Sequence, residues 1–249
     1  KFSSPVRLIC GGTAPPPEMI RRLDRFGFHI KHLWGMTETT PLGIAGGLRP
    51  HMLDWPEAKQ LEARAKQGMP VPFVELRLMG EDGEAPWDGI ASGEIEVRGP
   101  WIAASYYNAP EQADCWTKDG WFKTGDVATM DEHGYVRIVD RAKDLVKSGG
   151  EWISSVDLEN ALMGHPSVKE ACVIGIHHPK WQERPLAAVV LRDGTRATPE
   201  DLRGFLAKSF AKWQLPDAFV FVDAIPRTSV GKFKKTALRE QFADWKWDV

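Results

Sequence analysis

The sequence predicts an α/β region with a β-barrel-like subdomain, followed by a small C-terminal α+β domain, and three features of its 249 residues support this fold class. Residues 1–67 hold a strand, a helix and a strand in succession, which is the pattern of a parallel βαβ unit. Residues 68–140 hold short strands of alternating apolar side chains, as antiparallel sheets do. Helices and strands alternate again over 144–249. We therefore expect two domains, 1–140 and 144–249, joined at residues 141–143.

The βαβ unit is predicted from three elements, and one more helix follows it. An apolar strand covers 6–10, and apolar residues at helical spacing predict a helix over 17–26 that ends at Gly27. A second strand covers 28–33, and a helix with a mixed surface covers 53–67. Ligands bind at the loops that follow the carboxyl ends of parallel strands, so the loops after both strands are candidates for a binding site.

The barrel-like subdomain is predicted from strands at 74–79 and 93–98, whose apolar residues alternate. A glycine turn at 124–126 precedes a β-hairpin, whose two strands we expect at 127–130 and 135–139. Together these segments predict an antiparallel sheet.

A charged segment, residues 140–144 (Asp-Arg-Ala-Lys-Asp), has no hydrophobic period. On composition alone, a solvated surface loop is favoured there over a domain joint. A short strand at 145–146 follows. Gly149 and Gly150 come next, and glycines can adopt positive φ angles that bring backbone amides close to a ligand.

The last domain begins with a helix that Ser154 and Asp157 start in a pattern like a capping box. Strands are expected at 170–176 and 187–191, separated by a polar loop at 177–185. The remaining predicted elements are a helix begun by Thr198-Pro199, a strand at 218–222 and a helix at 235–242.

Composition excludes several classes of protein. A net charge of −2 gives no general attraction to nucleic acid, and no apolar run is long enough for a transmembrane segment. The three cysteines are odd in number and have no metal-binding spacing, which favours a reducing, cytoplasmic location over a disulfide-bonded one.

Five motifs occur in order along the chain: WGMTE (34–38), GEIEVRG (93–99), TGD (124–126), DRAKDLVKSGGEWIS (140–154) and PRTSVGK (226–232). This series resembles the adenylate-forming superfamily, which contains acyl-CoA synthetases, acyl-adenylating luciferases and peptide-synthetase adenylation domains. The resemblance covers essentially the whole chain and is strongest to medium- and long-chain fatty acyl-CoA ligases.

The resemblance implies a nucleotide site in the first domain. Trp34 would stack on adenine, the hydroxyl of Thr37 would contact a phosphate, and Glu38 would hold Mg²⁺. Without the other motifs, a buried tryptophan and a solvent-exposed glutamate are the preferred explanation of this loop. The resemblance also places backbone-lining residues against the nucleotide, namely Gly12, Thr13, Ala14, Gly35 and Met36, although the first three also fit an ordinary strand–helix connection.

Ribose contacts and a pivot are implied further along. Asp126 can accept two hydroxyl hydrogen bonds from ribose, and Arg141 provides fixed donors to the same sugar. The alternatives are a turn-initiating aspartate and a surface salt bridge. Lys143 matches the position about which the small domain of this superfamily reorients, so a mobile C-terminal domain is expected.

The second domain supplies the remaining candidates. The resemblance places a glycine-rich segment along the channel for the pantetheine arm of coenzyme A, although a plain β-turn would also explain it. Lys232 matches the lysine that bridges the attacking carboxylate and the α-phosphate, whereas Lys234 and Lys235 beside it suggest a solvated basic surface. The channel residues are Ser148, Gly149, Gly150, Glu151 and Trp152.

The implied reaction converts a medium- or long-chain fatty acid and ATP to an acyl-adenylate, and then forms acyl-CoA with release of AMP. A carrier-protein-loading enzyme, a ligase for a short thioether or aryl acid, and a non-catalytic binding fragment are the alternatives. The Lys-containing phosphate loop of the superfamily has no match here, and the chain opens at Lys1 close to a strand. We therefore expect the C-terminal part of a longer enzyme, inactive alone, with homodimerisation left open.

Overall fold

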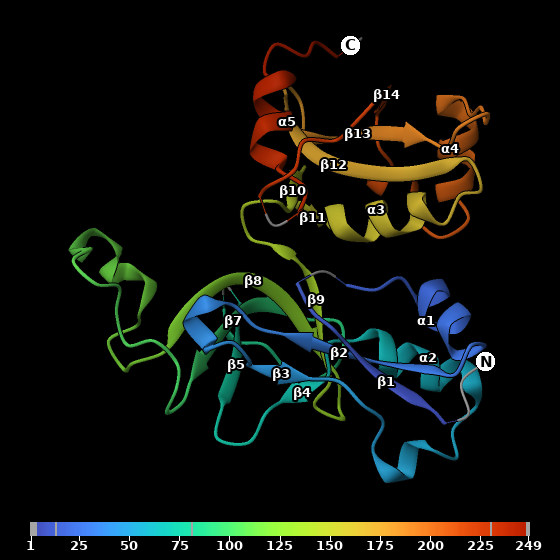
Figure 1. Cartoon of the computed structure of the whole chain (residues 1–249). Helices are drawn as coiled ribbons and strands as arrows, with labels where there is room; N and C mark the ends of the chain where they lie inside the picture. Colours follow the sequence, from blue (N-terminus) through green and yellow to red (C-terminus); the bar gives the residue numbers. More distant parts are fainter. Residues whose placement is uncertain (1–3, 13, 81, 230, 248–249) are drawn as a thin grey trace. The chain divides into compact units, whose positions relative to one another are not determined.

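A computed structural model describes residues 4–12, 14–80, 82–229 and 231–247 of the chain. The chain divides into two compact units, Lys1–Val139 and Asp140–Val249, called here the first and second unit (Figure 1). Among the described residues, no helix is both long and apolar enough to cross a membrane. The predicted domain limits and the hinge at 141–143 stay predictions.

A parallel βαβ unit opens the first unit, as predicted. Strands β1 (Val6–Cys10) and β2 (Phe28–Trp34) pair in parallel, and helix α1 (Pro17–Asp24) connects them. Helix α2 (Glu57–Ala65) is shorter than the predicted 53–67, because Pro56 can only stand at its start. The other elements in this region are β3 (Ile44–Ala45), β4 (Met69–Pro70) and the 3₁₀ helices η1 (Thr37–Thr39) and η2 (Pro50–Met52).

A five-stranded sheet in the order β6-β5-β7-β8-β9 completes the first unit. Its buried face gathers large apolar side chains, among them Leu78, Ile95 and Phe122. The elements are β5 (Glu75–Gly80), β6 (Gly83–Glu84), β7 (Ser92–Arg98), η3 (Pro110–Cys115), β8 (Phe122–Met130) and β9 (Val136–Arg141).

The predicted turn at 124–126 is instead an irregularity inside β8. Glu94 pairs with Val127 and Glu96 with Lys123, so three residues of β8 lie opposite the single residue Ile95. Gly125 has a φ of 73°, which permits this bulge. The prediction of a turn before the strand was therefore wrong in placing it outside the sheet.

The second unit is a sheet in the order β11-β10-β13-β12, with β14 also paired to β13 and helices on both faces (Figure 1). Ala171 and Val173 of β12 face the cluster formed with α3 and α4, whereas Cys172 and Ile174 face the cluster that includes Leu238 of α5. The elements are β10 (Val146–Ser148), β11 (Glu151–Ile153), α3 (Ser155–Met163), β12 (Val168–His178), β13 (Gln182–Leu191), α4 (Pro199–Leu206), η4 (Lys212–Gln214), β14 (Ala218–Phe221) and α5 (Lys235–Gln241).

The polar loop expected at 177–185 is mostly strand. β12 continues to His178 and β13 begins at Gln182, so only three residues separate the two strands. His178 and Arg184 are buried, and Arg184 is fully occupied by hydrogen bonds. These two side chains are satisfied within the protein, whereas His177, Lys180 and Gln182 are exposed, as the polar composition indicated.

The charged segment at 140–144 is not a solvated loop throughout. Asp140 is 2% exposed and accepts hydrogen bonds from the backbone nitrogen and the hydroxyl of Ser155, at 2.7 and 2.5 Å. Asp144 is also buried, whereas Arg141 and Lys143 are exposed. Composition alone therefore gave the wrong environment for the two aspartates.

Candidate functional site

The carboxyl ends of β1 and β2 lie at one edge of the parallel sheet, because Cys10 pairs with His32. The loops that follow both strands therefore leave the sheet at the same edge, where α/β folds bind ligands. Gly12 has a φ of 83° and is exposed, and Ala14 is half-buried. Thr13 lies outside the described residues.

Two of the predicted nucleotide motifs meet through a hydrogen bond. The indole Nε1 of Trp34, the last residue of β2, donates to Oδ2 of Asp126 on β8 at 2.7 Å. These residues are 92 positions apart in the sequence. The βαβ unit and the antiparallel sheet thus contribute one motif each to the same place.

The side chain of Trp34 is buried within the first unit. Its side chain is 7% exposed and belongs to a cluster of buried residues with Ile44 and Val74. A Cβ added to Gly43 would come within 2.6 Å of the indole ring, so the backbone of Gly43 packs against it. A stacking role for Trp34 remains a prediction, and its indole nitrogen fixes the carboxylate of Asp126.

The bulge in β8 orients Asp126. The hydroxyl of Thr124 donates to the carbonyl of Ile95 at 2.8 Å, and the amide of Gly125 donates to Oε1 of Glu94 at 2.9 Å. The amide of Asp126 donates to Oγ1 of Thr124 at 3.1 Å. Each residue of the motif is therefore held by a separate hydrogen bond.

Gly35 occupies a position that admits no side chain. An added Cβ would lie 1.8 Å from the carbonyl oxygen of Pro41. Gly35→Ala is expected to destabilise the chain by on the order of 3 kcal/mol, because this backbone contact cannot relax cheaply. Thermal unfolding of the chain measures the effect. The control is Gly11→Ala, whose added Cβ would be 3.5 Å from its nearest neighbour. Equal melting temperatures for the two variants would contradict the prediction.

Glu38 is held by a tyrosine that sequence reasoning missed. The hydroxyl of Tyr106 donates to Oε1 of Glu38 at 2.5 Å, and this hydrogen bond raises the pKa of Tyr106 to about 12. The backbone of Glu38 also accepts from the amide of Ala103 at 2.8 Å. Tyr106 lies in an irregular segment without a periodic pattern, so no sequence signal pointed to it. Thr37, the neighbouring candidate, is exposed.

Glu38 is the residue predicted to bind magnesium. The side chain is half-buried, and its carboxylate is oriented by Tyr106. Within the described ranges, no group of three or more histidine, cysteine, aspartate or glutamate side chains could hold a metal ion. Mg²⁺ is commonly bound by one or two carboxylates together with substrate phosphates. Glu38 is a single carboxylate of this kind, and its role as a magnesium ligand stays a prediction.

The predicted pantetheine segment of the second unit forms a tight β-hairpin. Ser148 pairs with Glu151, so Gly149 and Gly150 form a two-residue turn, with φ angles of 62° and 89°. A Cβ on Gly149 would lie 3.0 Å from the ring of Trp181. The turn thus presents bare backbone beside an aromatic ring, and Trp152, the next residue of β11, is exposed.

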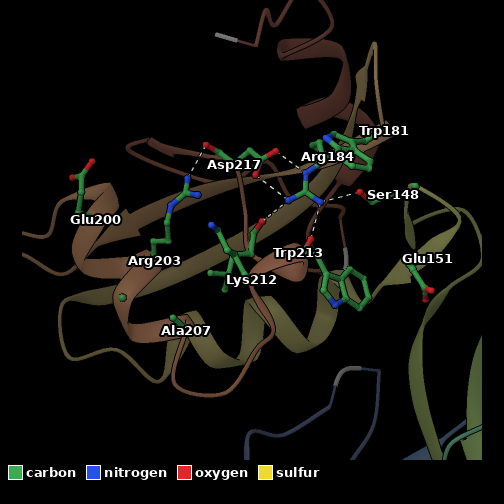
Figure 2. Close-up of a pocket in the computed structure, with 13 residues that line it drawn as sticks. Ser148, Glu151, Trp181, Arg184, Glu200, Arg203, Ala207, Lys212, Trp213 and Asp217 are labelled. Atoms are coloured by element: carbon green, nitrogen blue, oxygen red, sulfur yellow. Dashed lines mark hydrogen bonds and ion pairs between the residues drawn. The ribbon is translucent and has the colours of Figure 1, made fainter. Parts of the chain in front are cut away.

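A groove of about 1090 Å³ in the second unit adjoins this turn (Figure 2). The exposed rings of Trp181 and Trp213 line it together with Ser148, Gly149 and Glu151. The groove also carries charged side chains of both signs, among them Arg203, Lys212 and Glu200, so it combines an apolar lining with charged groups.

Arg184 forms the floor of the groove and is fixed by hydrogen bonds (Figure 2). Its guanidinium donates to both carboxylate oxygens of Asp217, at 2.6 and 2.9 Å, and to Oγ of Ser148 at 2.8 Å. It also donates to the carbonyls of Trp213 and Leu215, at 2.7 and 3.0 Å. Arg184 therefore shapes the groove, and its donors are already engaged within the protein. Its neighbours Gln182 and Glu183 are also polar, so no sequence signal distinguished Arg184.

Lys232 is exposed at the end of a small hairpin. The amide of Thr228 donates to the carbonyl of Lys232 at 2.7 Å, and the amide of Lys232 donates to Oγ1 of Thr228 at 3.2 Å. Lys234 is exposed, but Lys235 is not: its side chain is 11% exposed and pairs with Glu159 at 2.8 Å. The suggestion of a solvated basic surface was therefore wrong for Lys235.

Two known protein families match this chain. The family described as AMP-binding enzyme matches residues 1–107, and the AMP-binding enzyme C-terminal domain matches residues 157–232. The chain belongs to the family of AMP-binding enzymes. The predicted resemblance to the adenylate-forming superfamily is thereby confirmed, and the two matched regions lie one in each unit.

Relatives of this AMP-binding chain include two curated ligases. A long-chain-fatty-acid–CoA ligase of Thermus thermophilus is 54% identical over 242 residues, which cover 96% of this chain and 44% of the relative. A 3-methylmercaptopropionyl-CoA ligase of Ruegeria pomeroyi is 46% identical, covering 98% and 45%. The chain therefore spans just under half the length of these relatives.

Solved structures show the same fold. ATP-bound MatB from Rhodopseudomonas palustris aligns with a TM-score of 0.82 at 31% identity, over 95% of this chain and 45% of that chain. The fold class predicted from the sequence is confirmed by this similarity.

The predicted site residues fall into three groups. Gly12, Ala14, the loop 34–38 and Asp126 belong to the first unit, where Trp34 contacts Asp126 directly. In the second unit, residues 148–152 form the glycine hairpin beside the groove. Arg141, Lys143 and Lys232 are exposed residues of the same unit.

Proposed function

We propose that the chain is part of an AMP-forming acid–thiol ligase that activates a medium- or long-chain fatty acid with ATP and transfers it to coenzyme A. The activity is assigned to the complete polypeptide, since the chain spans 44% of the Thermus thermophilus ligase. The main support is the hydrogen bond between Trp34 and Asp126, which joins two nucleotide motifs at the ligand-binding edge of the βαβ unit.

In the first step, a carboxylate oxygen of the fatty acid attacks the α-phosphorus of ATP, and the bond to pyrophosphate breaks. Asp126 would accept hydrogen bonds from the ribose, with Arg141 as a further donor to it. The ammonium of Lys232 would lie between the two anionic reactants and stabilise the developing charge. Glu38 would hold Mg²⁺, which supplies charge neutralisation at the phosphates.

In the second step, the thiol sulfur of coenzyme A attacks the acyl carbon, and AMP leaves as the acyl–phosphate bond breaks. The proton of the thiol goes to solvent. We propose that the bare backbone of Gly149 and Gly150 lines the path of the pantetheine arm, between Ser148 and the residues Glu151 and Trp152. A pivot at 141–143, with Lys143 as its centre, would let the second unit serve both steps in turn.

The groove beside this turn is the surface we propose for the remainder of coenzyme A. Trp213→Ala is expected to raise the KM for CoA about tenfold, because an exposed aromatic ring that stacks on a base contributes roughly 1–3 kcal/mol. Adenylate formation should be unchanged. The control is Phe221→Ala, an exposed aromatic on β14 that does not line the groove. An unchanged KM for CoA in the Trp213 variant would contradict this assignment.

Consumption of CoA thiol by the complete enzyme tests the proposal across acids of graded chain length. We expect turnover with fatty acids of medium or long chain. The relative from Ruegeria pomeroyi makes a short thioether acid the second candidate, so methylmercaptopropionate belongs in the panel. Transfer to a carrier protein but not to CoA would favour a loading enzyme. No thioester with any acid would favour a non-catalytic role.

The 249 residues alone are expected not to turn over ATP, because the sequence has no match to the phosphate loop of the superfamily. We propose that an N-terminal part of the same enzyme supplies that loop, and leave a homodimer as a prediction. A cytoplasmic location is proposed from the three cysteines, none of which is disulfide-bonded in the described structure.

A further inference from the structure

Helix α5 (Lys235–Gln241) begins three residues after Lys232 and carries two cations one helical turn apart, Lys235 and Arg239. Residues four positions apart lie on the same side of a helix, so both side chains leave α5 in one direction. Their side chains are 11% and 28% exposed, respectively. Neither of them has a part in the reaction steps proposed above.

Arg239 binds the end of the charged segment 140–144. Its Nη2 donates to the carbonyl of Lys143 at 3.2 Å and to Oδ1 of Asp144 at 2.8 Å. Asp144 is buried, so this ion pair is poorly screened by solvent. Arg239 therefore holds the main chain at the residue predicted to be the pivot.

Lys235 reaches the beginning of the same segment through one hydroxyl group. Its Nζ pairs with Oε1 of Glu159 at 2.8 Å and donates to Oγ of Ser155. That hydroxyl in turn donates to Oδ2 of Asp140 at 2.5 Å. Lys235 is thus linked to Asp140 by two consecutive hydrogen bonds.

The contacts of Lys235 are buried and charged, which makes them costly to break. Asp140 and Glu159 are both buried. Lys235 contacts Glu159 directly and Asp140 through the hydroxyl of Ser155. Removing one partner of a buried ion pair leaves an uncompensated charge and is strongly destabilising. Glu159 is itself fixed, because it accepts a hydrogen bond from the amide of Val173 at 2.8 Å.

The hairpin that carries Lys232 is continuous with α5. The amide of Lys234 donates to the carbonyl of Pro226 at 2.8 Å, which closes the base of the hairpin directly before the helix. Arg227, on the other side of the hairpin, pairs with Glu170 of β12 at 2.9 Å. The hairpin therefore leads directly into α5.

We propose that α5 couples the segment Asp140–Asp144 to the hairpin of Lys232, and that Lys235 and Arg239 are positioning residues for that lysine. Because one side of α5 binds both ends of the segment, backbone rotation at 141–143 strains the contacts of Lys235 or of Arg239, so the conformation of the segment and the position of the helix and hairpin depend on each other. The assignment of Lys232 rests on the proposed function, whereas the coupling is a property of the second unit alone.

Amide hydrogen exchange in the 249-residue chain tests the coupling without reference to activity. Arg239→Gln is expected to speed exchange about fivefold or more in peptides of both the 140–147 segment and the 226–234 hairpin. Exchange in β12 and β13 should be unchanged. Faster exchange in the 140–147 segment alone, or in neither, would overturn the proposal. Glu240→Gln, an exposed charge on the same helix, serves as the matched control.

A second arm uses the complete enzyme. Arg239→Gln should lower the kcat of acid-dependent ATP–pyrophosphate exchange about tenfold with an unchanged KM for ATP, because a displaced catalytic group reduces the rate. Thioester formation from supplied acyl-adenylate should change less than about twofold, and Arg239→Lys should recover most of the rate. Equal loss of both steps would overturn the positioning role. A wild-type enzyme without any exchange would instead reject the proposed function and leave the hydrogen-exchange result decisive for the coupling.

Discussion

Lys232→Ala in the complete enzyme is expected to lower acyl-adenylate formation by about 10²–10³-fold, because it removes one preorganised charge from the transition state. Conversion of supplied acyl-adenylate to acyl-CoA should fall less than about threefold. Lys232 is exposed on a hairpin closed by the hydrogen bonds to Thr228, so its loss should leave the fold intact. Separate assays of pyrophosphate exchange and of thioester formation measure the two steps.

Lys234→Ala is the matched control for this variant, since Lys234 is also exposed and lies two residues away. It should leave both half-reactions near the wild-type rate. If both lysine variants slow adenylate formation equally, the basic surface as a whole attracts the substrates and Lys232 has no special part. Equal loss of both half-reactions in the Lys232 variant would also contradict its role.

Asp126→Ala should reduce kcat/KM for ATP by about 10²-fold, mainly through KM, because the ribose loses a charged acceptor. It should also destabilise the first unit by about 1–3 kcal/mol, since the buried Nε1 of Trp34 loses its hydrogen-bond partner. Steady-state kinetics of the complete enzyme and thermal unfolding measure the two effects.

Asp126→Asn separates binding from stability. An asparagine oxygen can still accept from Trp34, so thermal stability should stay closer to wild type than in the alanine variant. The uncharged amide should still weaken ATP binding. An unchanged KM for ATP in both variants would show that Asp126 serves the fold and not the nucleotide.

Elements that depend on local signals were predictable. The βαβ unit followed from apolar periodicity, and the capping residues Ser154 and Thr198 mark the starts of α3 and α4 as expected. The Gly149-Gly150 turn has the positive φ angles that the sequence suggested. In each case the decisive interactions lie within a few residues along the chain.

Features that depend on distant partners were not predictable. The bulge at Thr124–Asp126 arises from pairing with β7, about thirty residues earlier in the chain. The buried positions of Arg184 and Lys235 depend on Asp217 and Glu159, which composition cannot pair with them. In the candidate site, the hydrogen bond from Tyr106 to Glu38 was likewise not predictable, because it joins two residues that are 68 positions apart in the sequence.

The most direct test of the account is the product of ATP cleavage by the complete enzyme in the presence of a medium- or long-chain fatty acid and coenzyme A. We predict AMP and pyrophosphate in amounts equal to the acyl-CoA formed, with no AMP released when the acid is omitted. Release of ADP and phosphate, or AMP formation that does not depend on the acid, would contradict it.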